Sequence, residues 1–229
     1  MTGRLKGLGI VLVLIGFAFV AAGGYMFIRT NDGAKSLQAF SAAQNVKLAY
    51  NEQGQLVDRG ETAGAEEIMG LLTKDWGYPV VAADLNPNDP VVNTASEYMY
   101  QMATIAYHTL HGTQTVVLDK DVTADDGTVY KAGEYEFPIA GRYWSMFDRS
   151  NPIEAKAREQ AWTGTAHALI AELGVGSVTA STLQMGYGLA ALFAALGATI
   201  VLTGGGLVWA VRAPEKEKVP AFKPAPIPA

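Results

Sequence analysis

The sequence has 229 residues, of which 49% are hydrophobic, and its mean hydropathy is +0.13. Soluble domains are seldom this apolar, so the composition points first to membrane-spanning segments. The chain contains no cysteine, which excludes both a disulfide bond and a lipidated cysteine anchor.

Two uncharged apolar runs are long enough to cross a bilayer. The first covers residues 8–28 and the second covers residues 183–211. A hydrocarbon core of ~30 Å needs about 20 helical residues. We therefore expect a transmembrane helix at each run. We expect the first to be an uncleaved anchor and not a signal peptide, because its apolar run continues past the small residues at 20–22.

The charges predict the orientation of these two helices. Residues 1–7 carry two basic residues and no acid, and residues 212–229 carry four basic and two acidic residues. The segment between them, 29–184, contains 11 basic and 20 acidic residues, a net charge of −9. Short basic flanks remain in the cytoplasm. The sequence therefore predicts a protein of the cytoplasmic (plasma) membrane with both termini inside and the central domain outside.

The predicted organisation has five parts. They are a cytoplasmic N-terminus (1–7), transmembrane helix 1 (8–28), an extracytoplasmic α+β domain (29–182), transmembrane helix 2 (183–211) and a cytoplasmic Pro-rich tail (212–229). The fold class is thus a membrane protein with two transmembrane helices and an inserted extracytoplasmic α+β domain. A nucleic-acid partner is not expected, because the inserted domain is acidic and offers no basic patch.

The first half of the inserted domain alternates short elements with turns. Residues 35–43 should form a helix that continues from the first span. Residues 45–60 alternate apolar and polar residues about a turn at Gly54, which predicts a β-hairpin. Residues 62–77 have helical spacing and end at a glycine, and residues 78–93 form a connector rich in Pro and Asn.

A helix follows from Thr94 to Gly112. Thr94 and Glu97 form a capping-box pattern, and Gly112 is a natural stop. The residues with helical spacing on the expected core face are Ala95, Met99, Met102, Ala106 and Leu110.

Two of the three histidines of the chain, His108 and His111, lie on this helix. They continue a polar stripe through Glu97, Gln101 and Thr104, because residues three and four apart share a helix face. A solvated helix face explains the stripe. The alternative is a zinc or copper site, which needs a third ligand such as His167 or a carboxylate.

The second half of the domain is predicted to contain a strand at 113–118 and a hairpin at 119–137 that turns at Ala124–Gly127. An aromatic loop follows, and residues 151–174 should form one helix with Asn151 as cap, Pro152 at its first position and Gly174 at its end. The aspartates at 119–126 lack the glycine and glutamate of an EF-hand loop, so a polar turn is the simpler interpretation.

Small residues recur at every fourth position of the apolar runs. Such spacing lets helices approach closely in lipid. The contact could join the two spans of one chain or join this chain to another. The residues are Gly186, Ala190, Ala194 and Ala198 in the second run, and Ala18 and Ala22 in the first.

The segment "DRSNPIEAKAREQAWTGTAHALIAELGVGSVTASTLQMGYGLAALFAALG", residues 148–197, together with the two spans, resembles two-span actinobacterial membrane proteins of unknown function. Some of these are labelled aromatic ring-opening dioxygenase, which implies a non-haem iron enzyme. The chain shows no facial-triad pattern of two histidines and a carboxylate. The resemblance therefore implies the architecture and assigns no site residues.

Three functions remain open from the sequence. The leading hypothesis is a non-catalytic, membrane-anchored accessory or structural subunit of an envelope or respiratory-type membrane complex or a homo-oligomer. It would contact other membrane-protein subunits or itself, with the lipid bilayer around it and no cofactor. The alternative is an extracytoplasmic metal-binding protein or metalloenzyme that uses His108 and His111, with zinc or copper. The third is a small-ligand or lipid sensor that uses the aromatic loop Tyr143–Phe147.

Overall fold

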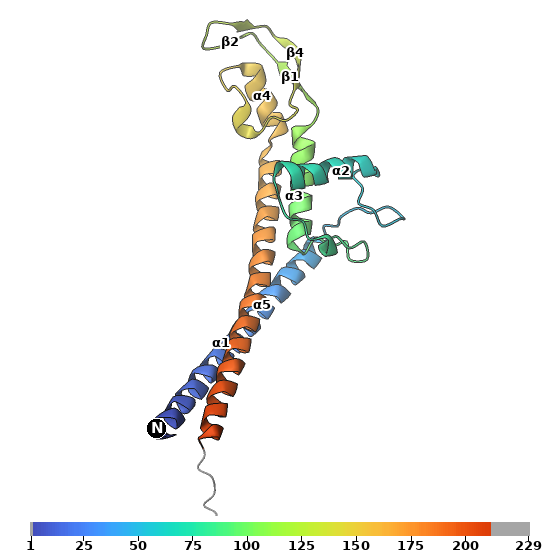
Figure 1. The fold of residues 1–229 in the computed structure, drawn as a ribbon. Coiled ribbons are helices and arrows are strands. Elements are labelled where there is room, and N and C mark those ends of the chain that lie inside the picture. The colour runs from blue at the N-terminus through green and yellow to red at the C-terminus, as the bar shows by residue number, and fades with distance from the viewer. Residues whose placement is uncertain (1, 212–229) are drawn as a thin grey trace, which may run out of the picture. The chain divides into compact units, whose positions relative to one another are not determined.

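The computed structural model describes residues 2–211, so the predicted Pro-rich tail lies outside the described residues. The chain divides into two compact units, one of Met1–Thr30 with Gly186–Ala229 and one of Asn31–Met185. Two long helices, α1 (Thr2–Gln44) and α5 (Gly164–Ala210), each contribute to both units. The first unit contains the two apolar runs, and the second contains the small α+β region between them (Figure 1).

In the first unit, α1 and α5 pack antiparallel through glycines at seven-residue spacing. A Cβ atom added to Gly16 would lie 2.7 Å from the carbonyl oxygen of Gly197, and one added to Gly197 would lie 2.7 Å from that of Gly16. Glycine is therefore required for the two backbones to approach this closely. Two similar contacts flank this one. The three pairs are Gly9 with Gly204, Gly16 with Gly197, and Gly23 with Ala190.

Both helices are long and apolar enough to cross a membrane. The most apolar 18-residue window of each has only 11% of its residues buried within the structure. The core helix of a soluble protein would be mostly buried. The large apolar surface of these helices, which the rest of residues 2–211 leaves uncovered, therefore fits a lipid environment better than water.

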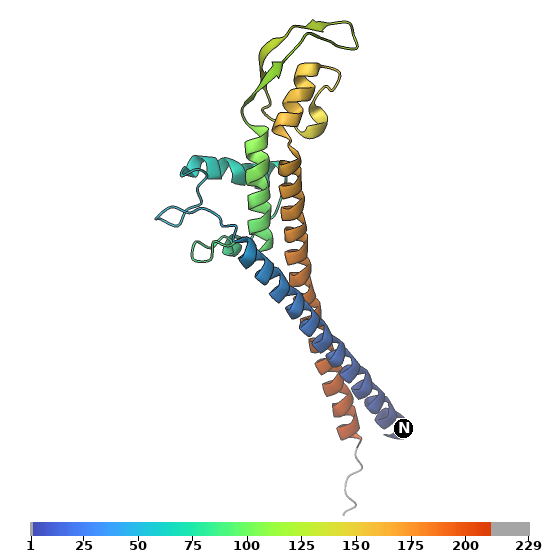
Figure 2. The same ribbon diagram turned by 180° about the vertical axis from the view of Figure 1, so that it is seen from behind.

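The second unit is built around α3 (Ala95–Leu110). The helix α2 (Thr62–Gly70), which continues as a π-helical turn η1 (Leu71–Asp75), packs on α3. Figures 1 and 2 both show α3 alongside the first part of α5. A short 3₁₀ turn, η2 (Ala82–Asp84), lies in the Pro- and Asn-rich connector. The helix predicted at 94–112 is confirmed, including its capping box.

Two small antiparallel pairs of strands make up the β part. β1 (Thr113–Leu118) pairs with β4 (Gly133–Pro138), with Val116 opposite Tyr135. β2 (Val122–Thr123) pairs with β3 (Val129–Tyr130) around the predicted turn. The helix α4 (Pro152–Ala161) covers β1 and β4, and a 3₁₀ turn, η3 (Trp144–Met146), lies in the aromatic loop. The predicted α+β content of the middle region is therefore confirmed.

The second unit has two hydrophobic clusters. The larger one joins α2, α3 and the part of α5 that belongs to this unit, and its fully buried members include Ile68, Leu72 and Ala103. The smaller one lies between the β1–β4 pair and α4, around Val116 and Ile139.

Residues 151–174 do not form the single helix that the sequence predicts. α4 ends at Ala161, and α5 begins anew at Gly164. Trp162 breaks the helix because its ring is buried in the smaller cluster and its Nε1 donates to the carbonyl of Arg142 at 3.0 Å. The Thr163 hydroxyl then accepts from the amide of Ala166, which caps the next helix.

Two further predictions about local structure are wrong. Gly174 does not end a helix, because α5 continues through it without interruption. Residues 45–60 do not form a regular hairpin. Isolated bridges join Tyr50 with Leu56, Asp58 with Glu61, and Lys47 with Val91 of the connector. A two-stranded hairpin with no further strand beside it is marginally stable. Backbone hydrogen bonds to the connector hold this segment, from the Leu48 amide to the Pro90 carbonyl and from the Val92 amide to the Val46 carbonyl.

The glycine contacts of the first unit give a direct test. We expect Gly16→Leu to lower the free energy of unfolding of the full chain in detergent by about 1–3 kcal/mol, the usual cost of overpacking. The control is Gly24→Leu, since a Cβ at Gly24 has no neighbour within 4 Å. The measurement is unfolding followed by circular dichroism. Equal destabilisation by both substitutions would contradict the packing.

Candidate functional site

His108 is held by a carboxylate from the loop before α2. Its Nε2 lies 2.9 Å from Oδ1 of Asp58. A tight turn fixes Asp58, because its amide and carbonyl both bond to Glu61 across Arg59 and Gly60, which have φ values of 51° and 91°. An ionised carboxylate only accepts, so Nε2 of His108 carries the hydrogen and Nδ1 remains for another partner.

His111 is exposed and turns back onto its own helix. Its Nδ1 lies 2.8 Å from the backbone carbonyl of Tyr107, and the two rings are 4.0 Å apart between centroids. The Tyr107 hydroxyl donates in turn to Glu67 of α2. This hydrogen bond to a carboxylate raises the pKa of Tyr107 to about 12. Two carboxylates therefore lie near the two histidines. Asp58 is hydrogen-bonded to the His108 ring, and Glu67 is hydrogen-bonded to the Tyr107 hydroxyl.

His167 lies apart from this pair, in an aromatic cluster at the first turn of α5. Its ring centroid is 5.0 Å from that of Trp144 and 5.6 Å from that of Trp162. The guanidinium of Arg158 lies 4.0 Å above the Trp144 ring. The aromatic loop thus packs on α4 and α5 through stacking and a cation–π contact, which fix its conformation.

Within residues 2–211, no group of three His, Asp or Glu side chains is arranged to hold a metal ion. The structure brings His108 together with Asp58 but not with His167. A carboxylate that orients a histidine is also a common feature around metal-binding histidines. The zinc or copper alternative thus stays a prediction, which elemental analysis of the purified protein tests.

Glu97 is buried, although it belongs to the stripe that the sequence predicts to be solvated. Only 1% of its surface is exposed. Its Oε2 accepts from the amides of Asn93 and Thr94 and from the Thr94 hydroxyl, all at 2.9–3.0 Å. Burial raises the pKa of Glu97 above its ordinary value of 4.5, while these hydrogen bonds oppose the shift. Glu97 is thus part of the core, with a structural role as the second half of the capping box.

Two buried tyrosine hydroxyls near this core have no hydrogen-bond partner among the described residues. Tyr50 and Tyr100 are buried at their oxygens and form no hydrogen bond with the described residues. Burial raises the pKa of Tyr100 above its usual range, and the charges of Asp58 and Tyr50 add to the effect. A polar interior of this kind is usually completed by buried water.

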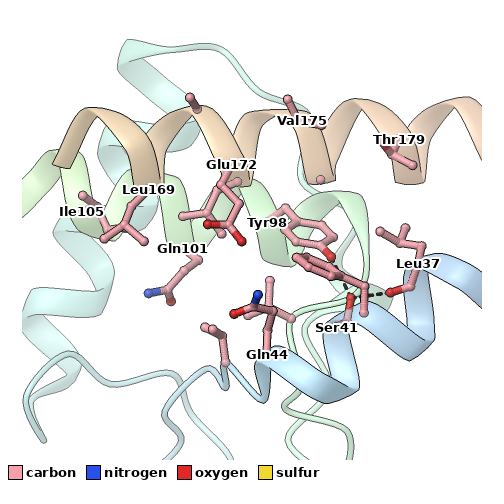
Figure 3. Close-up of a pocket in the computed structure, with 16 residues that line it drawn as sticks. Leu37, Ser41, Gln44, Tyr98, Gln101, Ile105, Leu169, Glu172, Val175 and Thr179 are labelled. Carbon is pink, nitrogen blue, oxygen red and sulfur yellow. Dashed lines mark hydrogen bonds between the residues drawn. The ribbon is translucent and has the colours of Figure 1, made fainter. Parts of the chain in front are cut away.

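An apolar groove with a volume of about 530 Å³ lies between α1, α3 and α5 in the second unit. Aliphatic and aromatic side chains form most of its lining, including Leu37, Ile105 and Val175. Figure 3 shows Glu172 reaching from α5 and Gln44 reaching from α1 into the space between these helices, with Gln101 of α3 beside them. No sequence pattern singled out this groove, because its lining comes from three separate segments.

Tyr98 forms one wall of this groove. A Cβ on Gly176 of α5 would lie 2.5 Å from the Tyr98 ring, so the ring packs directly on the backbone of α5. The Ser41 hydroxyl donates to the carbonyl of Leu37 at 2.9 Å and lies 2.7 Å from the Tyr98 hydroxyl. Because Ser41 has one hydrogen to donate, Tyr98 donates to Ser41.

The small residues of the apolar runs occupy different environments. Ala190 is buried against Gly23, and Gly186 lies beside Thr30. Ala194 and Ala22 are half-buried, whereas Ala18 and Ala198 are exposed. The closest contacts are made by glycines at seven-residue spacing, which the pattern of small residues at every fourth position does not include.

No protein-family model matches the chain, and no curated protein and no solved structure matches it.

Glu97 gives a prediction with a defined pH dependence. Its pKa is raised in the folded chain, so the folded state binds this proton more tightly than the unfolded state does. The stability from this group is fully present below about pH 4.5 and is lost as the pH rises through the folded-state pKa. Glu97→Gln keeps a capping side chain and cannot titrate.

We therefore expect the unfolding temperature of Glu97→Gln to rise relative to that of the unsubstituted chain as the pH increases. Circular dichroism melts of the two proteins between about pH 4 and pH 8 measure this difference. Glu97→Ala, which loses the cap and does not titrate either, should be less stable than Glu97→Gln by about 1–3 kcal/mol at every pH. A difference between the glutamate and glutamine forms that does not change with pH would contradict the burial of a titrating group.

Proposed function

We propose that this chain is a non-catalytic, membrane-anchored accessory or structural subunit that acts through contacts with other membrane proteins or with its own copies. In this proposal α1 and α5 span the cytoplasmic membrane, both termini are inside, and the α+β region lies outside. The observation that carries the proposal is the uncovered apolar surface of the two helices, of which only 11% of the most apolar windows is buried.

The tight pairing of α1 and α5 supports a permanent anchor. A cleaved signal sequence has no need of a fitted partner helix, whereas the glycine contacts match the backbones of the two helices at three successive levels. The absence of Asp, Glu, Lys, Arg and His from both apolar runs argues against a transport path through this chain alone.

The outward faces of the paired helices support protein contacts. Ala18 and Ala198 are small and exposed, so neither is used in the pairing of α1 with α5. Small exposed positions on a membrane helix allow the backbone of another helix to approach.

The polar side chains of the α+β region also fit a structural role better than catalysis. Glu97 serves the cap of α3, His108 is paired with Asp58, and Arg142 is paired with Glu154. These groups are engaged in contacts that hold the domain together. The architecture also agrees with the resemblance to two-span membrane proteins, which stays a prediction.

Purification in a mild detergent tests the proposal. We expect the chain to be recovered in a complex larger than its own 24.3 kDa, with itself or with other membrane proteins. Ala18→Leu combined with Ala198→Leu should weaken that complex, while Leu14→Phe, at an exposed position of α1 that is already occupied by a large side chain, should leave it intact. The measurement is native mass spectrometry. Recovery of a dispersed monomer alone would overturn the proposal.

A further inference from the structure

We propose that the groove between α1, α3 and α5 binds a single-chain lipid with an uncharged, hydroxyl-bearing headgroup, of which a monoacylglycerol is the simplest example. The proposal rests on the placement of the two apolar runs in a membrane, but not on the accessory role of the chain.

The size of the groove fits a small molecule. Its volume of about 530 Å³ falls within the ~300–1,000 Å³ typical of small-molecule sites. The space therefore suits one flexible chain with a small headgroup.

The lining consists of an apolar wall and a few polar ends, which are the side chains of Glu172, Gln44 and Gln101. Phe40 and Leu37 of α1, Ile105 of α3, and Leu169 and Val175 of α5 provide the apolar wall. Sites that bind apolar ligands usually combine such a wall with a small number of polar groups that fix the orientation of the ligand. An acyl chain would lie along the wall.

The polar ends have unused hydrogen-bonding capacity. The side chains of Glu172, Gln44 and Gln101 form no hydrogen bond or ion pair with the other described residues, and those of Glu172 and Gln44 are exposed. Two amides supply donors and acceptors, and a carboxylate supplies acceptors. A headgroup with several hydroxyls can satisfy all three side chains at once.

The charge of the lining selects among lipid headgroups. None of the described residues that line the groove is Lys, Arg or His, and Glu172 is its only ionisable carboxylate. A fatty acid or a phosphate group would place a negative charge beside Glu172 with no cation to compensate it. The groove therefore favours an uncharged headgroup over an anionic one.

The position of the groove in the sequence provides a route for the lipid. Its lining residues on α1 begin at Leu37, after the apolar run that ends at residue 28, and those on α5 end at Thr179, before the run that starts at residue 183. Both helices continue without a break between the groove and the apolar runs. The apolar runs would therefore hold the chain at the bilayer into which such a ligand partitions.

Photo-crosslinking tests the site. The full chain in phosphatidylcholine vesicles is exposed to a monoacylglycerol that carries a diazirine in its chain, and the labelled peptides are identified by mass spectrometry. We expect labelling of peptides that contain the groove residues, in addition to any labelling of the apolar runs. Labelling confined to the apolar runs would overturn the proposal.

A pair of valines on α5 provides the matched variants. Val175 lines the groove and Val178 does not, and each is 67% exposed. Val175→Trp should reduce groove labelling about tenfold because the added ring fills the space, and Val178→Trp should leave it unchanged. Phe40→Trp, at a second groove position that is 48% exposed, is a further filling variant if Val175→Trp does not fold. Equal labelling in the filled and control variants would overturn the site.

The headgroup has its own arm of the experiment. A fatty acid probe with the same diazirine-bearing acyl chain should label the groove about tenfold less than the monoacylglycerol probe does. Glu172→Gln should reduce this difference in labelling between the two probes. Equal labelling by the two probes in the unsubstituted chain would overturn the headgroup assignment.

A Val175→Cys variant, in which that cysteine is the only one of the chain, tests whether a second copy of the chain covers the groove instead. An oxidised disulfide-linked dimer would show that a second copy covers the groove and would overturn the lipid proposal.

Discussion

The α+β region depends on the contact between one tyrosine and one glycine. The Tyr98 ring lies against the backbone of α5 at Gly176, where a methyl group would be 2.5 Å from the ring. Its hydroxyl donates to Ser41 of α1, so one side chain of α3 joins three helices. Ser177 of α5 adds a bond to the carbonyl of Ala95, at the start of α3. Without the glycine, α3 could not approach α5 this closely.

This joint, the contact of Tyr98 with Gly176 and Ser41, determines the position of the groups around it. Tyr98 forms one wall of the apolar groove, and α3, which it fixes to α5, also carries Glu97 and His108. The buried capping box at one end of α3 and the pairing of His108 with Asp58 near the other end hold the connecting loops against the helix. The groove is thus the space between α1, α3 and α5, which approach one another most closely at Tyr98. The lipid binding proposed for the groove follows from the side chains that line it and not from a catalytic group.

The sequence predicted the elements with strong local signals. The apolar runs, the capping box of α3 and the strand at Thr113–Leu118 all appear in the structure. These features depend on composition or on residues a few positions apart, which the sequence displays directly. The aspartate-rich segment likewise forms a turn between two short strands.

Features that depend on distant contacts were not predictable in the same way. The break at Trp162 arises from burial of its ring and a bond to Arg142, and the burial of Glu97 arises from loops that fold over it. Gly174 looked like a helix stop, but α5 continues through it, and Gly176 two residues later contacts Tyr98. The lining of the groove could not be assembled from the sequence, because it needs the three helices in place.

The most direct test of this joint compares two glycines on α5. Gly176→Ala should lower the free energy of unfolding of the full chain by about 1–3 kcal/mol, because the methyl group meets the Tyr98 ring. Gly174→Ala meets only the Met102 sulfur at 3.8 Å, so it should stabilise α5 by about 0.5–1 kcal/mol through helix propensity. Denaturant unfolding in detergent measures both values. Equal stabilisation by the two substitutions would contradict the joint between Tyr98 and Gly176.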